Sequence, residues 1–322
     1  MISTLELRNF RGLEHVKFEE LGRVNLIVGG NNAGKTSILE ALVLLHGNST
    51  QLTKLPSTFR QEVQNDNVVN FWSMLPRDKK WKGFWVSDGA LNITAHISDK
   101  EVRVNLENGS KADSLFWLQQ GGKLGLRGYG DGLSILSTAQ DPPENISELF
   151  NRIAPLNPRN EDRIQDLIRR SIEPRLQRLR YAKPLGTKSH LVYADVGEGE
   201  MLPFTQLGQA FSRALQVYCE IFAKSPKILL VDEIENGLYY EGLEDYWRGL
   251  LEVLEDQNVQ LFATTHSREC MEAAHRAAKT RDSYPIRYLR LDRRVDDPAK
   301  IVATSFGEEV MESAIQFNKE MR

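Results

Sequence analysis

We expect this chain of 322 residues to adopt an α/β fold built on a mainly parallel central sheet. Two observations predict it. An apolar strand at residues 24–28 runs through a glycine loop into a helix with one buried face, at 37–45. Two more apolar strands, at 227–231 and 260–264, are each followed by a helix, and continuous apolar runs are typical of parallel strands covered on both faces.

The composition is that of an ordinary globular protein, with 41% hydrophobic and 26% charged residues. The net charge of −3 and the pI near 6.1 exclude a polycation, so any nucleic-acid contact requires a local basic patch. Two cysteines, Cys219 and Cys270, support no disulfide framework or zinc cluster and suit a reducing cytosol. We find no signal peptide and no apolar run long enough to span a bilayer, and expect a cytoplasmic protein without membrane contact.

The first lobe begins with a strand at residues 2–8, whose hairpin partner is expected at 16–18. From residue 46 to about 141 the pattern changes to short β-type runs, the clearest at 90–97 and 101–106. We interpret this region as a β-rich elaboration of the first lobe. It contains four of the five tryptophans, which would form either a local core under loops or a surface for a partner.

Beyond Pro142 and Pro143 the apolar spacing becomes helical. We expect helices at 145–153, 160–172, 207–222, 243–254, 269–277 and 306–321, and strands at 191–194, 287–291 and 301–304. No internal repeat or clean linker interrupts the chain. One composite domain over 1–322 follows, with a β-rich lobe at 1–141, a helical lobe at 142–222 and a core with a C-terminal helix at 223–322.

The loop at residues 29–36 reads GGNNAGKT and matches the phosphate-binding pattern GxxxxGK[ST]. Glycines allow backbone N–H groups to close around phosphate oxygens at the positive end of a helix. Lys35 would reach the β- and γ-phosphates, and the Thr36 hydroxyl would ligate Mg²⁺. The strand and helix on either side disfavour an ordinary glycine turn. We therefore predict a nucleoside triphosphate site that includes Gly29, Asn31, Asn32, Ala33, Gly34, Lys35, Thr36 and Ser37.

The apolar strand at 228–231 ends in two carboxylates, Asp232 and Glu233. An aspartate at the tip of such a strand would complete Mg²⁺ coordination beside Thr36. Glu233 would accept a proton from the attacking water or orient it. The alternative interpretation is a strand that simply runs into an acidic turn, and the presence of a phosphate loop makes this alternative less favoured.

The next buried strand ends at His266, 34 residues after Asp232. A lone histidine is more often structural than catalytic. At the carboxyl end of a buried strand, however, it would lie in the crevice where α/β sheets bind ligands. We expect His266 to sense the γ-phosphate through a hydrogen bond.

The order of these segments, with a helix start at 207–213 between the phosphate loop and the Asp-Glu strand, resembles that of the ABC ATPases and of the SMC and RecF heads. Residues 5–12 and 29–36 look like the opening of RecF and of the overcoming-lysogenization-defect (OLD) ATPases. Residues 232–238 and 264–267 are similar to the OLD group in particular. The resemblance implies an ABC/SMC-like P-loop ATPase head that hydrolyses ATP with Mg²⁺, with a β-rich flank and a helical lobe.

The resemblance also implies a homodimer or higher homo-oligomer that closes face to face around two ATP molecules. The helix start is the signature that completes the site of the opposite subunit, which gives Gly208 a role in trans. It further implies a separate effector, typically a nuclease, in phage defence or DNA processing. The glutamine of the lobe-connecting loop corresponds to Gln140.

This chain departs from the family pattern in several places. Many OLD proteins carry a C-terminal TOPRIM nuclease, whereas this chain stops after the ATPase, with no acidic cluster beyond Phe306. Gln209-Ala210 stands where related signatures have a small residue or glycine, and a Cβ on Ala210 would crowd the partner's γ-phosphate and slow hydrolysis. Tyr239 occupies a position where histidine is common in the OLD group.

Two alternatives remain open. Residues 152–180 hold eight arginines against four acids, a stretch that could pair with DNA phosphates as in a RecF-like repair clamp. A solvated helical face or an acidic protein partner is the favoured interpretation of these arginines. The unusual signature instead favours a regulatory scaffold with structural ATP and negligible hydrolysis. A nuclease within this chain is the least favoured function.

Overall fold

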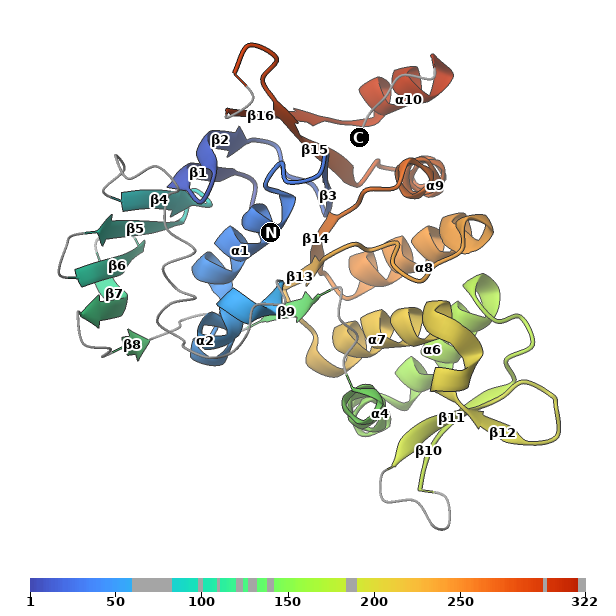
Figure 1. The fold of residues 1–322 in the computed structure, drawn as a ribbon. Coiled ribbons are helices and arrows are strands. Elements are labelled where there is room, and N and C mark those ends of the chain that lie inside the picture. The colour runs from blue at the N-terminus through green and yellow to red at the C-terminus, as the bar shows by residue number, and fades with distance from the viewer. Residues whose placement is uncertain are drawn as a thin grey trace. The chain divides into compact units, whose positions relative to one another are not determined.

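The computed structural model describes residues 1–59, 83–97, 101–108, 111–119, 124–126, 132–137, 142–183, 190–297 and 300–317 (Figure 1). The chain forms two compact units. The first comprises Met1–Leu133, Phe262–His266 and Ile286–Arg322, and the second comprises Ser134–Leu261 and Ser267–Pro285. The composite domain expected from the sequence, with its three parts, stays a prediction.

An antiparallel sheet of seven strands, in the order β2-β1-β4-β5-β6-β7-β8, forms one side of the first unit. Its register pairs Leu7 with Val16 on β2 and with Val86 on β4. Leu5 and Leu7 are fully buried on the inward face of β1. The sheet confirms the β-rich elaboration predicted for this region. Its strands are β1 (Leu5–Phe10), β2 (Leu13–Phe18), β4 (Gly83–Ser87), β5 (Leu91–Ile97), β6 (Glu101–Asn108), β7 (Lys111–Gln119) and β8 (Leu124–Leu126).

The other side of the first unit carries the glycine loop. β3 (Val24–Gly29) is buried along its whole length and pairs in parallel with β15 (Ile286–Arg293), which pairs antiparallel with β16 (Ile301–Phe306). The helices of this unit are α1 (Lys35–His46), α2 (Ser49–Thr58) and α10 (Glu308–Gln316). α2 was not predicted. A capping box between Asn48 and Gln51 begins it, in which each side chain bonds the other residue's backbone N–H.

A second sheet has the strand order β16-β15-β3-β14-β13-β9. β14 (Gln260–Thr264) passes from the second unit into the first between Leu261 and Phe262. Within the second unit, β13 (Ile228–Val231) is fully buried, and β9 (Leu133–Leu136) reaches it through the backbone bond from Asp232 N–H to the Leu136 carbonyl (2.8 Å).

Helices surround α7 (Gly208–Lys224) in the second unit, where every residue from Phe211 to Ala223 is buried. α6 packs against both α7 and α8, and a small antiparallel sheet, β10-β11-β12, packs against α4 (Figure 1). The other elements are α4 (Pro143–Asn151), α5 (Ile153–Leu156), α6 (Pro158–Ser171), β10 (Arg178–Ala182), β11 (Leu191–Asp195), β12 (Met201–Pro203), two short 3₁₀ turns (Phe204–Leu207 and Tyr240–Gly242), α8 (Leu243–Asp256) and α9 (Arg268–Lys279).

The predicted helices and strands from residue 145 onward are present, with ends shifted by a few residues. One such shift is at the C-terminal helix, expected at 306–321, of which residues 318–321 lie outside the described residues. β16 continues to Phe306 because its ring stacks on Tyr288 of β15, with centroids 5.1 Å apart, and α10 starts two residues later. In the part of the chain that the structure describes, none of the helices combines the length and the apolar character that a membrane span needs.

Candidate nucleotide site

The backbone of the glycine loop explains its sequence. Gly29, the last residue of β3, has φ +137°, and a Cβ there would lie 2.2 Å from the Leu291 carbonyl oxygen of the neighbouring strand. Gly34 precedes α1 with φ +97°, and its Cβ would lie 2.8 Å from Leu13 Cδ2. Asn32 is also left-handed, at φ +59°. A side chain at Gly29 would collide with backbone, and one at Gly34 would be strained by the left-handed conformation. Such positions are typical of a loop that wraps an anion with backbone N–H groups.

Helix α1 begins without a side-chain cap and without an acidic residue in its first turn. The first N–H groups of a helix have no intrahelical partner, and the helix dipole makes that end positive. Thr36 is half-buried in this first turn and Ser37 is buried. The start of α1 is therefore electrostatically suited to a phosphate group.

Lys35 folds back over the loop. Its Nζ donates to the carbonyl oxygens of Gly29 (2.7 Å) and Gly30 (2.9 Å), and the residue is only 5% exposed. A second cation holds the loop from β15, because Arg293 Nη2 donates to the Asn32 carbonyl at 3.1 Å. The fold thus fixes one buried positive charge at the loop, in the place where the sequence predicts phosphate binding.

His266 belongs to the same unit as the loop. The N–H of Thr265 donates to the Ile27 carbonyl (3.1 Å), two residues before Gly29. His266 is the next residue and is half-buried. The first unit thus brings the end of β14 beside the end of β3 and holds Gly29–Ser37 and His266 together.

The acidic residues lie in the second unit, at the end of β13. Asp232 is 6% exposed, and Glu233 takes a left-handed conformation with φ +48°. Arg213 of α7 is 2% exposed and reaches this strand end. Its Nη2 donates to the Asp232 carbonyl (2.9 Å), and its Nη1 donates to the Ser137 carbonyl (3.0 Å). Arg213, buried within α7, thus supports the Asp232 backbone, and the sequence motifs did not identify it.

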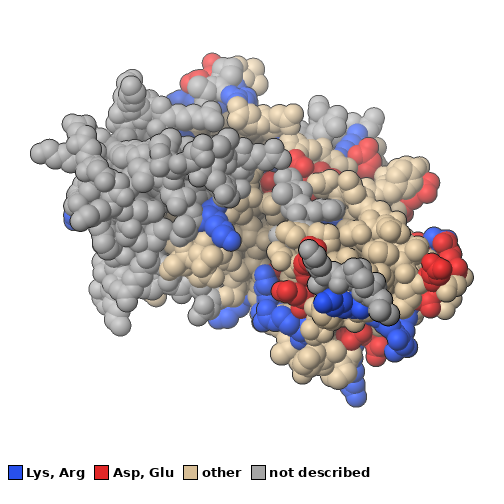
Figure 2. Space-filling view, turned by 60° about the horizontal axis from the view of Figure 1, so that its bottom comes forward, with Lys and Arg blue, Asp and Glu red and all other residues tan. Residues whose placement is uncertain are grey.

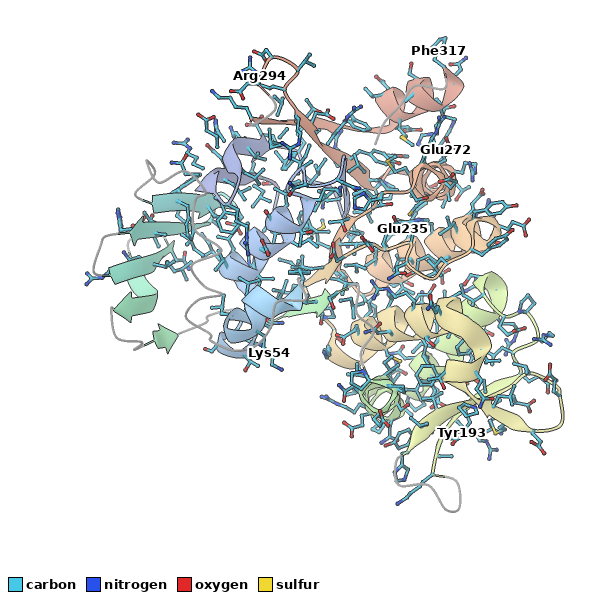
Figure 3. The ribbon with its side chains drawn as sticks, in the orientation of Figure 1. Lys54, Tyr193, Glu235, Glu272, Arg294 and Phe317 are labelled. Atoms are coloured by element: carbon cyan, nitrogen blue, oxygen red, sulfur yellow. The ribbon has the colours of Figure 1, made fainter. Side chains whose placement is uncertain are left out.

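The third carboxylate of the segment, Glu235, has a different task. Its Oε1 accepts from the Ser267 backbone N–H at 3.2 Å (Figure 3 labels Glu235). Ser267 in turn caps α9, because its hydroxyl accepts from the Cys270 N–H at 3.0 Å. Glu235 therefore fastens the acidic turn to the residue that follows His266. That role separates it from Asp232 and Glu233.

The predicted signature opens α7. Gly208 is exposed with φ +90°, and nothing lies within 4 Å of a Cβ built on it. Gln209 is also exposed and Ala210 is half-buried. A Cβ on Gly237, at φ +81°, would lie 2.9 Å from Gln209 Cβ, so the turn after the acidic residues packs on the start of α7. Gln140 lies outside the described residues.

The donor set suits Mg²⁺. Thr36 and Asp232 offer a hydroxyl and a carboxylate oxygen, the ligand type that Mg²⁺ prefers. Within the described ranges, no group of three or more His, Cys, Asp or Glu side chains is placed to hold a metal ion.

Comparison with known proteins supports the same kind of site. Residues 1–114 match the family described as "AAA ATPase domain", and residues 86–272 match the family described as "AAA domain, putative AbiEii toxin, Type IV TA system". An "ATP/GTP phosphatase" of Helicobacter pylori is 22% identical over 361 aligned positions, which cover 96% of each chain. "DNA replication and repair protein RecF" of Nitrosococcus oceani is 39% identical over 69 residues, or 21% of this chain and 19% of that protein.

The fold itself is that of an SMC head. The solved structure of an SMC head bound to the C-winged helix domain of ScpA has a TM-score of 0.59 and 13% identity, and covers 97% of this chain and 99% of its own. The ABC/SMC-like P-loop ATPase fold predicted from the sequence is confirmed. Because the match to residues 86–272 spans more than half of the chain, this protein belongs to the family described as "AAA domain, putative AbiEii toxin, Type IV TA system".

Proposed function

We propose that this protein is a Mg²⁺-dependent ATPase whose site combines the glycine loop with the acidic strand end. The loop geometry carries the proposal, because a side chain at Gly29 would meet backbone, one at Gly34 would be strained, and Lys35 places a buried cation at the loop. Lys35 and the loop N–H groups would bind the triphosphate. Thr36 and Asp232 would hold Mg²⁺, which when bound neutralises phosphate charge.

The remaining roles follow from position along the chain. Glu233 would orient the attacking water or take its proton, and His266 would donate a hydrogen bond to the γ-phosphate. The placement of His266 beside the end of β3 supports that assignment. The relative named as an ATP/GTP phosphatase supports hydrolysis, and the OLD-like segments support membership of that group.

ATP binding would also form a homodimer. The exposed Gly208 and Gln209 at the uncapped start of α7 are suited to contact a nucleotide held by a second copy. A ligand bound only in the closed dimer shifts the equilibrium by its differential affinity for that state. The output would reach a separate effector, of nuclease type, in phage defence or DNA processing in the cytoplasm. The toxin system in the family description is in keeping with such an effector.

Glu233→Gln tests the mechanism. We expect it to retain ATP, to slow turnover and to accumulate as a dimer in Mg-ATP, measured by light scattering after gel filtration. Lys35→Ala is the matched negative control and should stay monomeric at the same ATP concentration. A monomeric Glu233→Gln protein in saturating ATP would contradict the shared site. Wild-type protein that binds ATP without turnover would favour the regulatory scaffold.

A DNA-binding clamp is the second candidate, and the RecF match favours it. The eight arginines between residues 152 and 180 fall into two groups, according to whether an acidic side chain lies nearby. Arg163, Arg169 and Arg175 pair with nearby acids, and Arg170 lies 3.8 Å from Glu252. Charges of both signs are interspersed on the face in Figure 2. No ion pair within the described residues involves the other four, which are Arg152, Arg159, Arg178 and Arg180.

These four exposed arginines give a sharper test than the paired ones. If DNA binds here, reversing Arg178 and Arg180 to glutamate will reduce DNA affinity and the slope of its salt dependence. Arg175→Glu is the control, since that side chain is already held by Glu173 and Glu198. DNA affinity unchanged in the double variant, or equally reduced in the control, would remove this candidate.

A further inference from the structure

Two polar contacts, of which the first is buried, join α1 to turns of the antiparallel sheet. Arg11, in the turn between β1 and β2, donates from Nη2 to Glu40 Oε1 (2.7 Å), and its Nε contacts the other carboxylate oxygen. At the far end of the helix, His46 Nε2 lies 2.9 Å from Asp88 Oδ2, between β4 and β5. Only the first contact lies near the glycine loop.

Burying the Arg11–Glu40 ion pair has a high desolvation cost. Arg11 is 4% exposed and Glu40 is fully buried, and a buried ion pair is often no more stabilising than apolar residues of the same volume. Arg11 also has φ +54°, a left-handed backbone conformation that is unfavourable for residues other than glycine. Strain of this kind concentrates at functional sites. Both features occur together at one turn, so stability alone is a poor explanation for the pair.

The turn touches the loop as well as the helix. Leu13, two residues after Arg11, is the side chain that a Cβ on Gly34 would strike. Glu40 lies four residues after Thr36, so the two share one face of α1, about 6 Å apart along its axis. The pair therefore lies one helical turn from the proposed Mg²⁺ ligand.

We propose that Arg11 is a positioning residue for nucleotide binding, which acts through Glu40. A guanidinium that hydrogen-bonds one oxygen of a carboxylate and contacts the other constrains direction as well as distance. The pair would thereby fix the rotation of α1 about its own axis. The loop N–H groups, Lys35 and Thr36 would then stay oriented toward the phosphates. This inference rests on the proposed function, and it assigns Arg11 no contact with the nucleotide.

The experiment separates positioning from stability. Arg11→Met/Glu40→Met replaces the pair with apolar side chains of similar length, so the fold and the melting temperature should be nearly retained. We expect a fluorescent ATP analogue with Mg²⁺ to bind this variant about tenfold more weakly than wild type, as for other residues that orient a ligand-binding group. His46→Met is the matched control. It removes the contact at the far end of α1 and should leave nucleotide affinity unchanged.

Arg11→Lys keeps the charge but not the two-point contact, and it provides the test if the double variant does not fold. It should be folded and should bind the analogue measurably more weakly. Wild-type affinity in either folded variant, or an equal loss in His46→Met, would overturn the positioning role. Wild-type protein with no affinity for the analogue would instead refute the proposed function, so the two failures are distinguishable.

Discussion

The two halves of the proposed site are held in place by different means. In the glycine loop, backbone conformation and close approach decide the sequence, as at Gly29 and Gly34. At the acidic strand end, side chains hold the backbone in place: Arg213 donates a hydrogen bond to the Asp232 carbonyl, and Glu235 accepts one from the Ser267 N–H. A short motif records backbone constraints because few residue types satisfy them. It does not record supports that come from distant positions in the chain.

The largest expected effect is on the loop half. Lys35→Ala should weaken ATP binding by at least about 3 kcal/mol, roughly a hundredfold, because charge-assisted bonds to phosphate contribute about 1.5–3 kcal/mol each. Isothermal titration calorimetry measures the loss. Lys54→Ala, on the exposed part of α2, is the control and should bind as wild type does. Binding that survives in Lys35→Ala would rule out the loop as the phosphate site.

The backbone account of the loop makes a second prediction. Gly29→Ala should destabilise the protein by roughly 3 kcal/mol, because its Cβ would meet the Leu291 carbonyl oxygen. Gly30→Ala, where nothing lies within 4 Å of the new Cβ, should have a much smaller effect. Denaturant unfolding compares the pair. Equal stabilities would show that the loop is not under this constraint.

On the acidic side, Arg213→Met should cost about 2 kcal/mol of folding free energy, since one buried and one partly buried carbonyl group lose their donor. It should also slow ATP turnover through the position of Asp232. Lys224→Met, at the exposed end of α7, is the control. A variant with reduced stability but wild-type turnover would limit Arg213 to a structural role.

The smallest effect concerns a surface contact of the second unit. A hydrogen bond from Arg276 lowers the pKa of Glu244, and this outweighs the opposing effect of burial. A lowered folded-state pKa adds stability above the usual value of 4.5, and this stability is lost as the pH falls through the folded pKa. Glu244→Gln should therefore cost less than about 1 kcal/mol at pH 7 and progressively less below pH 4.5. A difference that grows on acidification would contradict this.

The elements that the sequence predicted are those with strong local signals. The apolar runs of β13 and β14 and the alternation in β5 and β6 were placed within a few residues. β10 was missed because its outward positions, Arg178 and Arg180, belong to a run of arginines that suggests a solvated helical face. The short strand β12 and the ten-residue helix α2 carry too few apolar residues to show a period.

Among the site residues, those of the loop were predictable because the local backbone conformation of the loop determines its residue pattern. Arg213 was not, because its partners are backbone carbonyls of residues 19 and 76 positions away. Trp85 shows the same limit: it lies half-buried in β4 with the Arg8 guanidinium 5.0 Å from its ring, which fits a local packing role. Such contacts depend on tertiary neighbours, which no local pattern specifies.

The central claim is that the glycine loop and the acidic strand end form one nucleotide site. The most direct measurement is the ratio of ATP affinities with and without Mg²⁺, by calorimetry, in wild type and in Asp232→Asn. If Asp232 holds the cation that the phosphates bind, Mg²⁺ will strengthen binding in wild type and most of that gain will be lost in the variant. An Asp232→Asn protein with the full Mg²⁺ effect would show that the two halves act separately.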